Sequence, residues 1–174
     1  KSFLALLLAL VMVLGLMPAM SLTVSAADAM PTSGTATLAN GKTYEFQTGT
    51  YTRNANFIIA SGTVTVHIPA NANVTINGIF DGINKVGSPF VVRSGATLNL
   101  IINGKLTCNG SQSPSTTGSD PLYNSVYAGI NVAAGGTLNI TTETGDGSTT
   151  GVLIAQAGNI TGDGSQGSAA GIGG

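Results

Sequence analysis

Two ten-residue segments of this chain, VVRSGATLNL at 91–100 and NVAAGGTLNI at 131–140, place small and hydrophobic residues at the same positions. Repetition at a fixed interval is typical of structures in which one unit stacks on the next. A third segment, IPANANVTI at 68–76, extends the alignment. The residues aligned in this way are Ile68, Val92 and Val132; Asn71, Gly95 and Gly135; Val74, Leu98 and Leu138; and Ile76, Leu100 and Ile140. Each copy combines an Asn or Gly turn with an alternating strand.

The second half of the chain indicates the length of the unit. A Gly followed by an aliphatic residue recurs at Gly129, Gly151 and Gly171. These spacings predict a unit of about 20–24 residues. The longer interval of 40 between the first two segments then contains one unit plus an insertion. Residues 109–127, rich in Ser, Pro and Gly, are predicted to be that inserted loop.

A short repeat of β-branched strands without helical periodicity excludes ankyrin and tetratricopeptide arrays, whose units are longer and helical. The sequence therefore predicts an all-β parallel β-helix, a solenoid, over residues 57–174. Equivalent aliphatic side chains would stack in columns inside it, and Asn side chains would hydrogen-bond between coils. In the stretch 61–68, the alternation points Val64, Val66 and Ile68 inward and leaves His67 as a solvated surface residue without a partner.

The first residues have a different character. Lys1, a long apolar stretch, Pro18 and a run of small residues predict a secretory signal peptide helix over 1–26, cleaved near Ala26 or Ala27. An uncleaved membrane anchor is the alternative interpretation. No further spanning segment is expected after cleavage. Residues 27–56 are predicted to supply cap strands, with a tight hairpin turn at Asn40 and Gly41. The repeats are expected to be incomplete at the C-terminal side.

The motifs GKTYEF, AGINVAAGGTLNI and AAGIGG, behind the signal sequence FLALLLALVMVLGLMP, resemble secreted or surface-displayed proteins of Gram-positive bacteria. The repeats of those proteins form right-handed β-helices of the pectin-lyase-like class. The resemblance covers most of residues 30–174 and implies a secreted or cell-surface location. This class includes polysaccharide lyases, glycosidases, carbohydrate binders and adhesins, so the resemblance to a fold does not select among them.

Charge is scarce in this chain, with only 7% Asp, Glu, Lys and Arg and a net charge of −1. Nucleic acid is therefore an unlikely partner class, because no basic run is available to neutralise phosphates. Catalysis on this fold is expected to need clustered carboxylates, and the acids form no recognisable cluster. The acids are Asp28, Glu45, Asp81, Asp120, Glu143, Asp146 and Asp163. The basic residues Arg93 and Lys105 have no acid at a matching position.

Three sets of residues are candidates for binding. The repeated TGDGS motif would stack Asp146 on Asp163, a candidate calcium site; in the alternative interpretation these residues only form turns. Tyr123 and Tyr127, at the end of the inserted loop, are the best candidates to contact glycans, since the chain has no Trp. The outward Thr residues at 63–65 suggest ice binding as a further interpretation, but this row of Thr is not expected to repeat on every coil. Cys108, the single cysteine, is expected to be a small buried residue.

The sequence thus predicts an exported, non-catalytic cell-surface β-helix module, adhesin-like or stalk-like. Its partners would be polysaccharides or host or cell-surface glycans, and it needs no cofactor other than the calcium of the candidate site. The alternative is a fragment of a polysaccharide lyase or glycoside hydrolase with the pectin-lyase-like fold.

Overall fold

The structure, a computed structural model, describes residues 26–31, 36–53, 56–78, 87–111, 127–142, 151–158 and 170–174. These residues form fourteen β-strands and no helix. Every described pairing between strands is parallel. The predicted all-β class with parallel sheets is therefore confirmed. The signal peptide predicted over 1–26 lies almost wholly outside the described residues.

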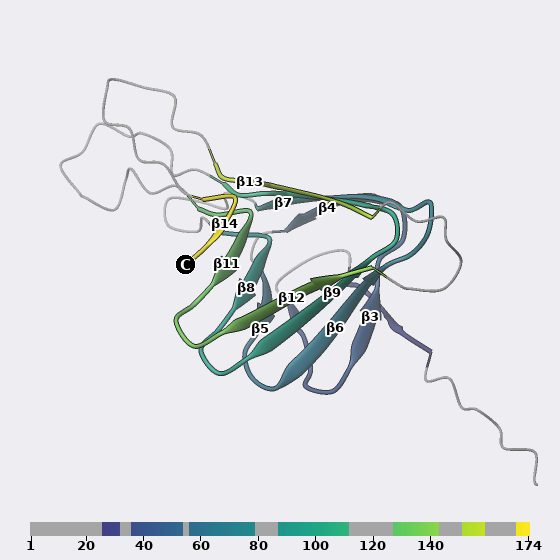
Figure 1. The fold of residues 1–174 in the computed structure, drawn as a ribbon. Coiled ribbons are helices and arrows are strands. Elements are labelled where there is room, and N and C mark those ends of the chain that lie inside the picture. The colour runs from purple at the N-terminus through teal and green to yellow at the C-terminus, as the bar shows by residue number, and fades with distance from the viewer. Residues whose placement is uncertain are drawn as a thin grey trace, which may run out of the picture.

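The strands belong to three sheets, which we call A, B and C (Figure 1). Sheet A contains, in spatial order, β1 (Asp28–Ala29), β3 (Thr43–Glu45), β6 (Thr63–Ile68), β9 (Thr97–Ile102) and β12 (Thr137–Thr141). Sheet B contains β2 (Ala36–Thr37), β5 (Phe57–Ile59), β8 (Phe90–Val92), β11 (Ile130–Val132) and β14 (Ile172–Gly173). Sheet C contains β4 (Gly49–Arg53), β7 (Asn73–Gly78), β10 (Lys105–Asn109) and β13 (Val152–Gln156).

Three consecutive strands, which we call a triplet, contribute one strand to each sheet. The triplets are β2–β4, β5–β7, β8–β10 and β11–β13, and each strand pairs with the strand three places further along the chain. Neighbouring parallel strands lie about 4.8 Å apart, so equivalent residues of successive triplets form columns. Val92 pairs with Val132, 40 residues later, as the repeat predicts.

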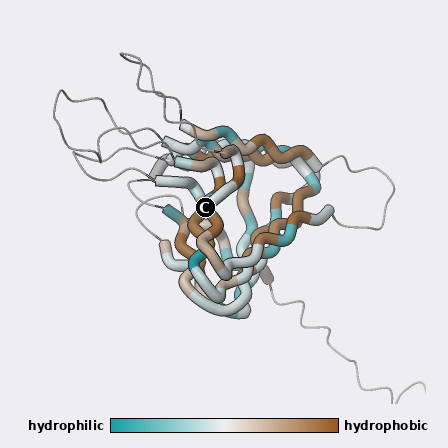
Figure 2. The backbone as a smooth tube through the Cα atoms, turned by 60° about the vertical axis from the view of Figure 1, so that its left-hand side comes forward, coloured by the Kyte–Doolittle hydropathy of each residue, from teal (hydrophilic) through white to brown (hydrophobic). Residues whose placement is uncertain are grey.

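A single hydrophobic core connects the three sheets. Along the strands, hydrophobic residues alternate with polar ones (Figure 2). In β6, Val64, Val66 and Ile68 are fully buried, while Thr63, Thr65 and His67 face outward, as predicted. Each buried aliphatic side chain contributes about 1.5–3 kcal/mol relative to an exposed one. The packing is less complete at β12, where Ile140 is 45% exposed although its partner Leu100 is fully buried.

The predicted register of the third segment is wrong. Strand β9 pairs with β6, so the copy equivalent to 92–100 is 59–66 and not 68–76. Residues 73–78 form β7, which lies in sheet C. The segment 68–76 misled the alignment because the corners at 69–72 and 93–96 have the same local pattern, a turn followed by an alternating strand. Asn71 and Gly95 both have positive φ, 63° and 75°, but they lie at different corners.

The predicted unit of 20–24 residues applies only to the first interval. Paired residues are 21–25 apart between the first and second triplets, 32–34 apart between the second and third, and 40–47 apart between the third and fourth. Gly151 precedes β13 in sheet C, so it is not equivalent to Gly129 and Gly171, which precede paired strands of sheet B. Extra residues between strands lengthen the interval without changing the pairing.

The predicted hairpin at Asn40 and Gly41 is also wrong, because the flanking strands β2 and β3 belong to different sheets. The turn instead bonds to the next triplet. The backbone N–H of Gly41 donates to the carbonyl oxygen of Thr63 at 2.7 Å, and the N–H of Thr63 donates to Asn40 Oδ1 at 2.9 Å. Residues 36–53 therefore continue the parallel sheets.

Candidate functional site

Threonine and asparagine form rows on the outward side of sheet A. Thr63, Thr97 and Thr137 are paired across three successive strands. In the adjacent row Asn replaces Thr: Thr65 is followed by Asn99 and Asn139. Only one of the two rows is therefore continuous in Thr, which does not give the regular hydroxyl array that ice binding would require.

Amide ladders connect successive strands, although the sequence predicts such hydrogen bonds for Asn side chains at turns. Asn139 Nδ2 donates to Asn99 Oδ1 at 2.8 Å in sheet A, and Asn109 Nδ2 donates to Asn77 Oδ1 at 2.9 Å in sheet C. The Oδ1 atom of Asn109 is buried and accepts no hydrogen bond. These ladders bond one strand to the next along the outside of the sheets, so their evident contribution is to stability.

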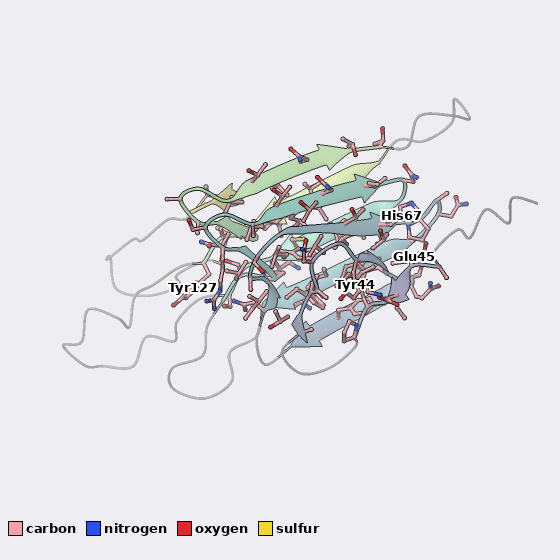
Figure 3. The ribbon with its side chains drawn as sticks, turned by 90° about the horizontal axis from the view of Figure 1, so that it is seen from below. Tyr44, Glu45, His67 and Tyr127 are labelled. Atoms are coloured by element: carbon pink, nitrogen blue, oxygen red, sulfur yellow. The ribbon has the colours of Figure 1, made fainter. Side chains whose placement is uncertain are left out.

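An imidazole and a carboxylate meet on the outward side of sheet A. Glu45 ends β3 and His67 is the fifth residue of β6, and the two residues are partners in the parallel register. His67 Nδ1 lies 3.1 Å from Glu45 Oε2. The His67 side chain is 19% exposed and the Glu45 side chain is 34% exposed, so water reaches both. Figure 3 shows the two side chains side by side at one end of the strands. The prediction that His67 has no partner is wrong.

Two amides border this pair. Asn103, just after β9 and 7% exposed, places Nδ2 3.4 Å from His67 Nε2. Gln47 Nε2 donates to Glu45 Oε1 at 3.4 Å. Both imidazole nitrogens therefore face a polar group. We call Glu45, His67, Asn103 and Gln47 the histidine cluster.

The histidine cluster spans three triplets, because Glu45 belongs to the first, His67 to the second and Asn103 to the third. Its chemical capacities are proton exchange at the imidazole, hydrogen bonding to hydroxyl or amide groups, and metal ligation. In the described part of the chain, no group of three or more His, Cys, Asp or Glu side chains is placed to hold a metal ion.

Sequence reasoning missed this cluster although a signal was present. The tripeptides Thr43-Tyr44-Glu45 and Thr65-Val66-His67 share the same alternation, and aligning their threonines places Glu45 opposite His67. The central residues, Tyr44 and Val66, both pack against the core. The outer residues therefore emerge on the same side of sheet A.

The predicted glycan site is described only in part. Tyr127 is half-buried; its N–H donates to the carbonyl oxygen of Ser111 at 3.1 Å, and its carbonyl oxygen accepts from the N–H of Gly158 at 3.0 Å. Ser111 and Tyr127 thus bond at the two ends of the predicted loop. Tyr123 lies outside the described residues. Figure 3 shows Tyr127 on the opposite side of the molecule from Glu45 and His67, so the structure does not bring them together.

The remaining candidates are placed as follows. Asp146 and Asp163, the candidate calcium ligands, lie outside the described residues. Arg93 and Lys105 are exposed, on a turn and at the start of β10. Cys108 is fully buried in β10, as predicted, and its burial raises the pKa of the thiol far above its usual range.

Comparison with known proteins gives no relative: no family model, no curated protein and no solved structure matches the chain. Within the residues that the structure describes, no helix has the length and apolar character needed to cross a bilayer.

Proposed function

We propose that the chain is an exported, non-catalytic cell-surface module, folded as a right-handed parallel β-helix, that serves as an adhesin or stalk and contacts glycans. The observation that carries this proposal is the parallel register of three sheets over successive triplets. Each triplet rests on the preceding one, which suits an elongated scaffold that holds a loop away from a surface.

The connectivity supports the right-handed winding. Phe57 in β5 and Phe90 in β8 are neighbours in sheet B, and the chain between them passes through sheets A and C. Crossover connections between parallel strands of one sheet are right-handed in about 98% of cases. A closed coil with this hand buries the shared core of the three sheets from all sides.

The chemistry of the outer surface supports a binding or structural role rather than catalysis. The outward rows of sheet A consist of hydroxyl and amide side chains, which offer hydrogen bonds to sugar hydroxyls without concentrating charge. Of the two described carboxylate side chains, Asp28 lies 3.4 Å from Lys42 Nζ and Glu45 lies 3.1 Å from His67 Nδ1.

The glycan contact is proposed at the predicted loop 109–127, through Tyr123 and Tyr127. Aromatic rings provide rigid apolar contact area together with a polar hydroxyl, which suits the faces and hydroxyls of sugars. The loop leaves the sheets after β10 and returns before β11. Binding energy at such a site is concentrated in a few aromatic residues.

A glycan array probed with the full chain tests this proposal. We expect retention on a subset of glycans and loss of that signal in the double variant Tyr123→Ala with Tyr127→Ala. The exposed Thr137→Ala on sheet A is the control and keeps the signal. Retention that survives the double substitution contradicts the site, and cleavage of any glycan contradicts the non-catalytic role.

A further inference from the structure

We propose that Glu45 Oε2 and His67 Nδ1 form a two-ligand site for a borderline transition-metal ion such as Zn²⁺, with water completing the coordination. The site belongs to the histidine cluster and does not depend on the glycan-binding proposal.

The separation of the two atoms fits a shared ion. Zinc binds imidazole nitrogen at about 2.0–2.1 Å and carboxylate oxygen at about 2.0–2.2 Å, so two such ligand atoms on one tetrahedral ion lie about 3.4 Å apart. The observed separation between Nδ1 and Oε2 is 3.1 Å. An ion that displaces the hydrogen-bond proton therefore lies to one side of the line between the two atoms and requires them to move apart by only a few tenths of an ångström. The register of β3 and β6 fixes both Cα positions.

The ligand types select the class of ion. Imidazole suits zinc, copper and nickel, whereas calcium and magnesium prefer sites made of oxygen atoms alone. The open positions face solvent, since the two side chains are 19% and 34% exposed. Water can therefore supply the remaining ligands, which is the arrangement of an open rather than a closed zinc site.

Asn103 supplies the support that a ligating histidine needs. Metal-bound histidines almost always donate the N–H of their other ring nitrogen to an oxygen acceptor, which fixes the tautomer. The Asn103 amide lies 3.4 Å from His67 Nε2. Rotation of this amide by half a turn brings Oδ1 to the same place, where it accepts the N–H of Nε2 once Nδ1 is bound to the ion.

The chain has a single histidine, so the NMR signals of its imidazole nitrogens do not overlap with those of another histidine. The experiment is a titration of the ¹⁵N-labelled full chain with Zn²⁺ alone at constant pH. We expect a saturable change in the ¹⁵N shift of Nδ1, characteristic of metal coordination, and the appearance of the ring proton on Nε2. Calcium at the same concentrations is expected to leave both nitrogens unchanged.

Matched variants separate this site from binding by an isolated imidazole. We expect Glu45→Gln to lower the zinc affinity at least about 10-fold, while the same change at the other described carboxylate, Asp28→Asn, leaves it unaltered. Asn103→Asp supplies a permanent acceptor for Nε2–H and is expected to raise the affinity. Circular dichroism verifies that each variant is folded. Absence of a saturable Nδ1 change, or an unaltered affinity in Glu45→Gln, overturns the proposal.

Discussion

Cys108 illustrates how the position of a residue in a column sets its chemistry. Its column in sheet C runs from Tyr51 through Ile76 and Cys108 to Ala155. The thiol is fully buried, and desolvation raises its pKa because the thiolate would lose its hydration. Only the thiolate is a good nucleophile, so the residue is chemically inert where it stands.

This burial predicts that the folded chain resists thiol reagents. At about pH 8, near the pKa of an exposed cysteine, we expect no reaction of Cys108 with Ellman's reagent, and full reaction after addition of denaturant. Absorbance of the released thiolate measures both. Rapid stoichiometric labelling of the folded protein would show that β10 opens frequently or that the thiol is accessible.

For His67, the local sequence predicts the direction of the side chain but not its partners. Alternation alone places the side chain outward, and this prediction is confirmed. Its partners come from 22 and 36 residues away in the sequence, so they depend on the register between strands rather than on local pattern. The site of Tyr123 and Tyr127 and the calcium site of Asp146 and Asp163 remain predictions.

At the scale of single elements, strand β9 carries the clearest alternation. Leu98, Leu100 and Ile102 are buried, while Thr97, Asn99 and Ile101 are half-buried and face outward. Leu100 lies between Val66 and Ile140 in its column. The strand therefore contributes one face to the core and one to the surface.

Replacing one residue on each side of β9 tests this arrangement. We expect Leu100→Ala to lower the free energy of unfolding by about 2–5 kcal/mol, because it leaves a cavity in the core. Its neighbour Ile101→Ala, on the outward side, should cost clearly less because no enclosed cavity forms. Urea denaturation followed by circular dichroism measures both values. Equal losses would contradict the assigned faces.

The turn between β8 and β9 depends on backbone conformation rather than on space. Gly95 has φ 75°, and a Cβ atom added there would meet nothing within 4 Å. We expect Gly95→Ala to cost about 1–2 kcal/mol, the penalty of an L-residue in the left-handed region. Gly95→Asn should cost less, since Asn71 adopts φ 63° in the same chain. A comparison of urea midpoints checks this order, and equal stability of both variants would contradict the argument.

At the scale of the whole molecule, the sequence predicts the class of fold better than its period. The 40-residue repeat between 91–100 and 131–140 matches the observed pairing register, because the two segments form strands of the same sheets. The shorter spacings compare strands of different sheets, which share alternation and turns but not neighbours. Connections of unequal length then hide the true period, because they change the sequence interval and leave the stacking of strands intact.

Stacking of this kind makes stability depend on contacts between neighbouring triplets. The Phe46 ring, just after β3, contacts three aromatic rings edge-on. Its centroid lies 4.6 Å from that of Tyr51, 5.6 Å from that of Phe57 and 6.3 Å from that of Phe90. These rings come from the first, second and third triplets, so the Phe46 side chain joins the first triplet to the two that follow.

Phe46→Ala is therefore expected to weaken one end of the molecule more than the rest. Loss of the buried ring should lower the free energy of unfolding by about 3–5 kcal/mol. Hydrogen exchange followed by mass spectrometry should show a larger loss of protection in β3 and β4 than in β12 and β13, since the fourth triplet makes none of the ring contacts of Phe46. The exposed Thr141→Ala is the control and should leave the pattern unchanged. A uniform increase in exchange over all strands would mean that the triplets unfold as one cooperative unit, because the coupling between neighbours then exceeds the energy of the aromatic contacts at Phe46.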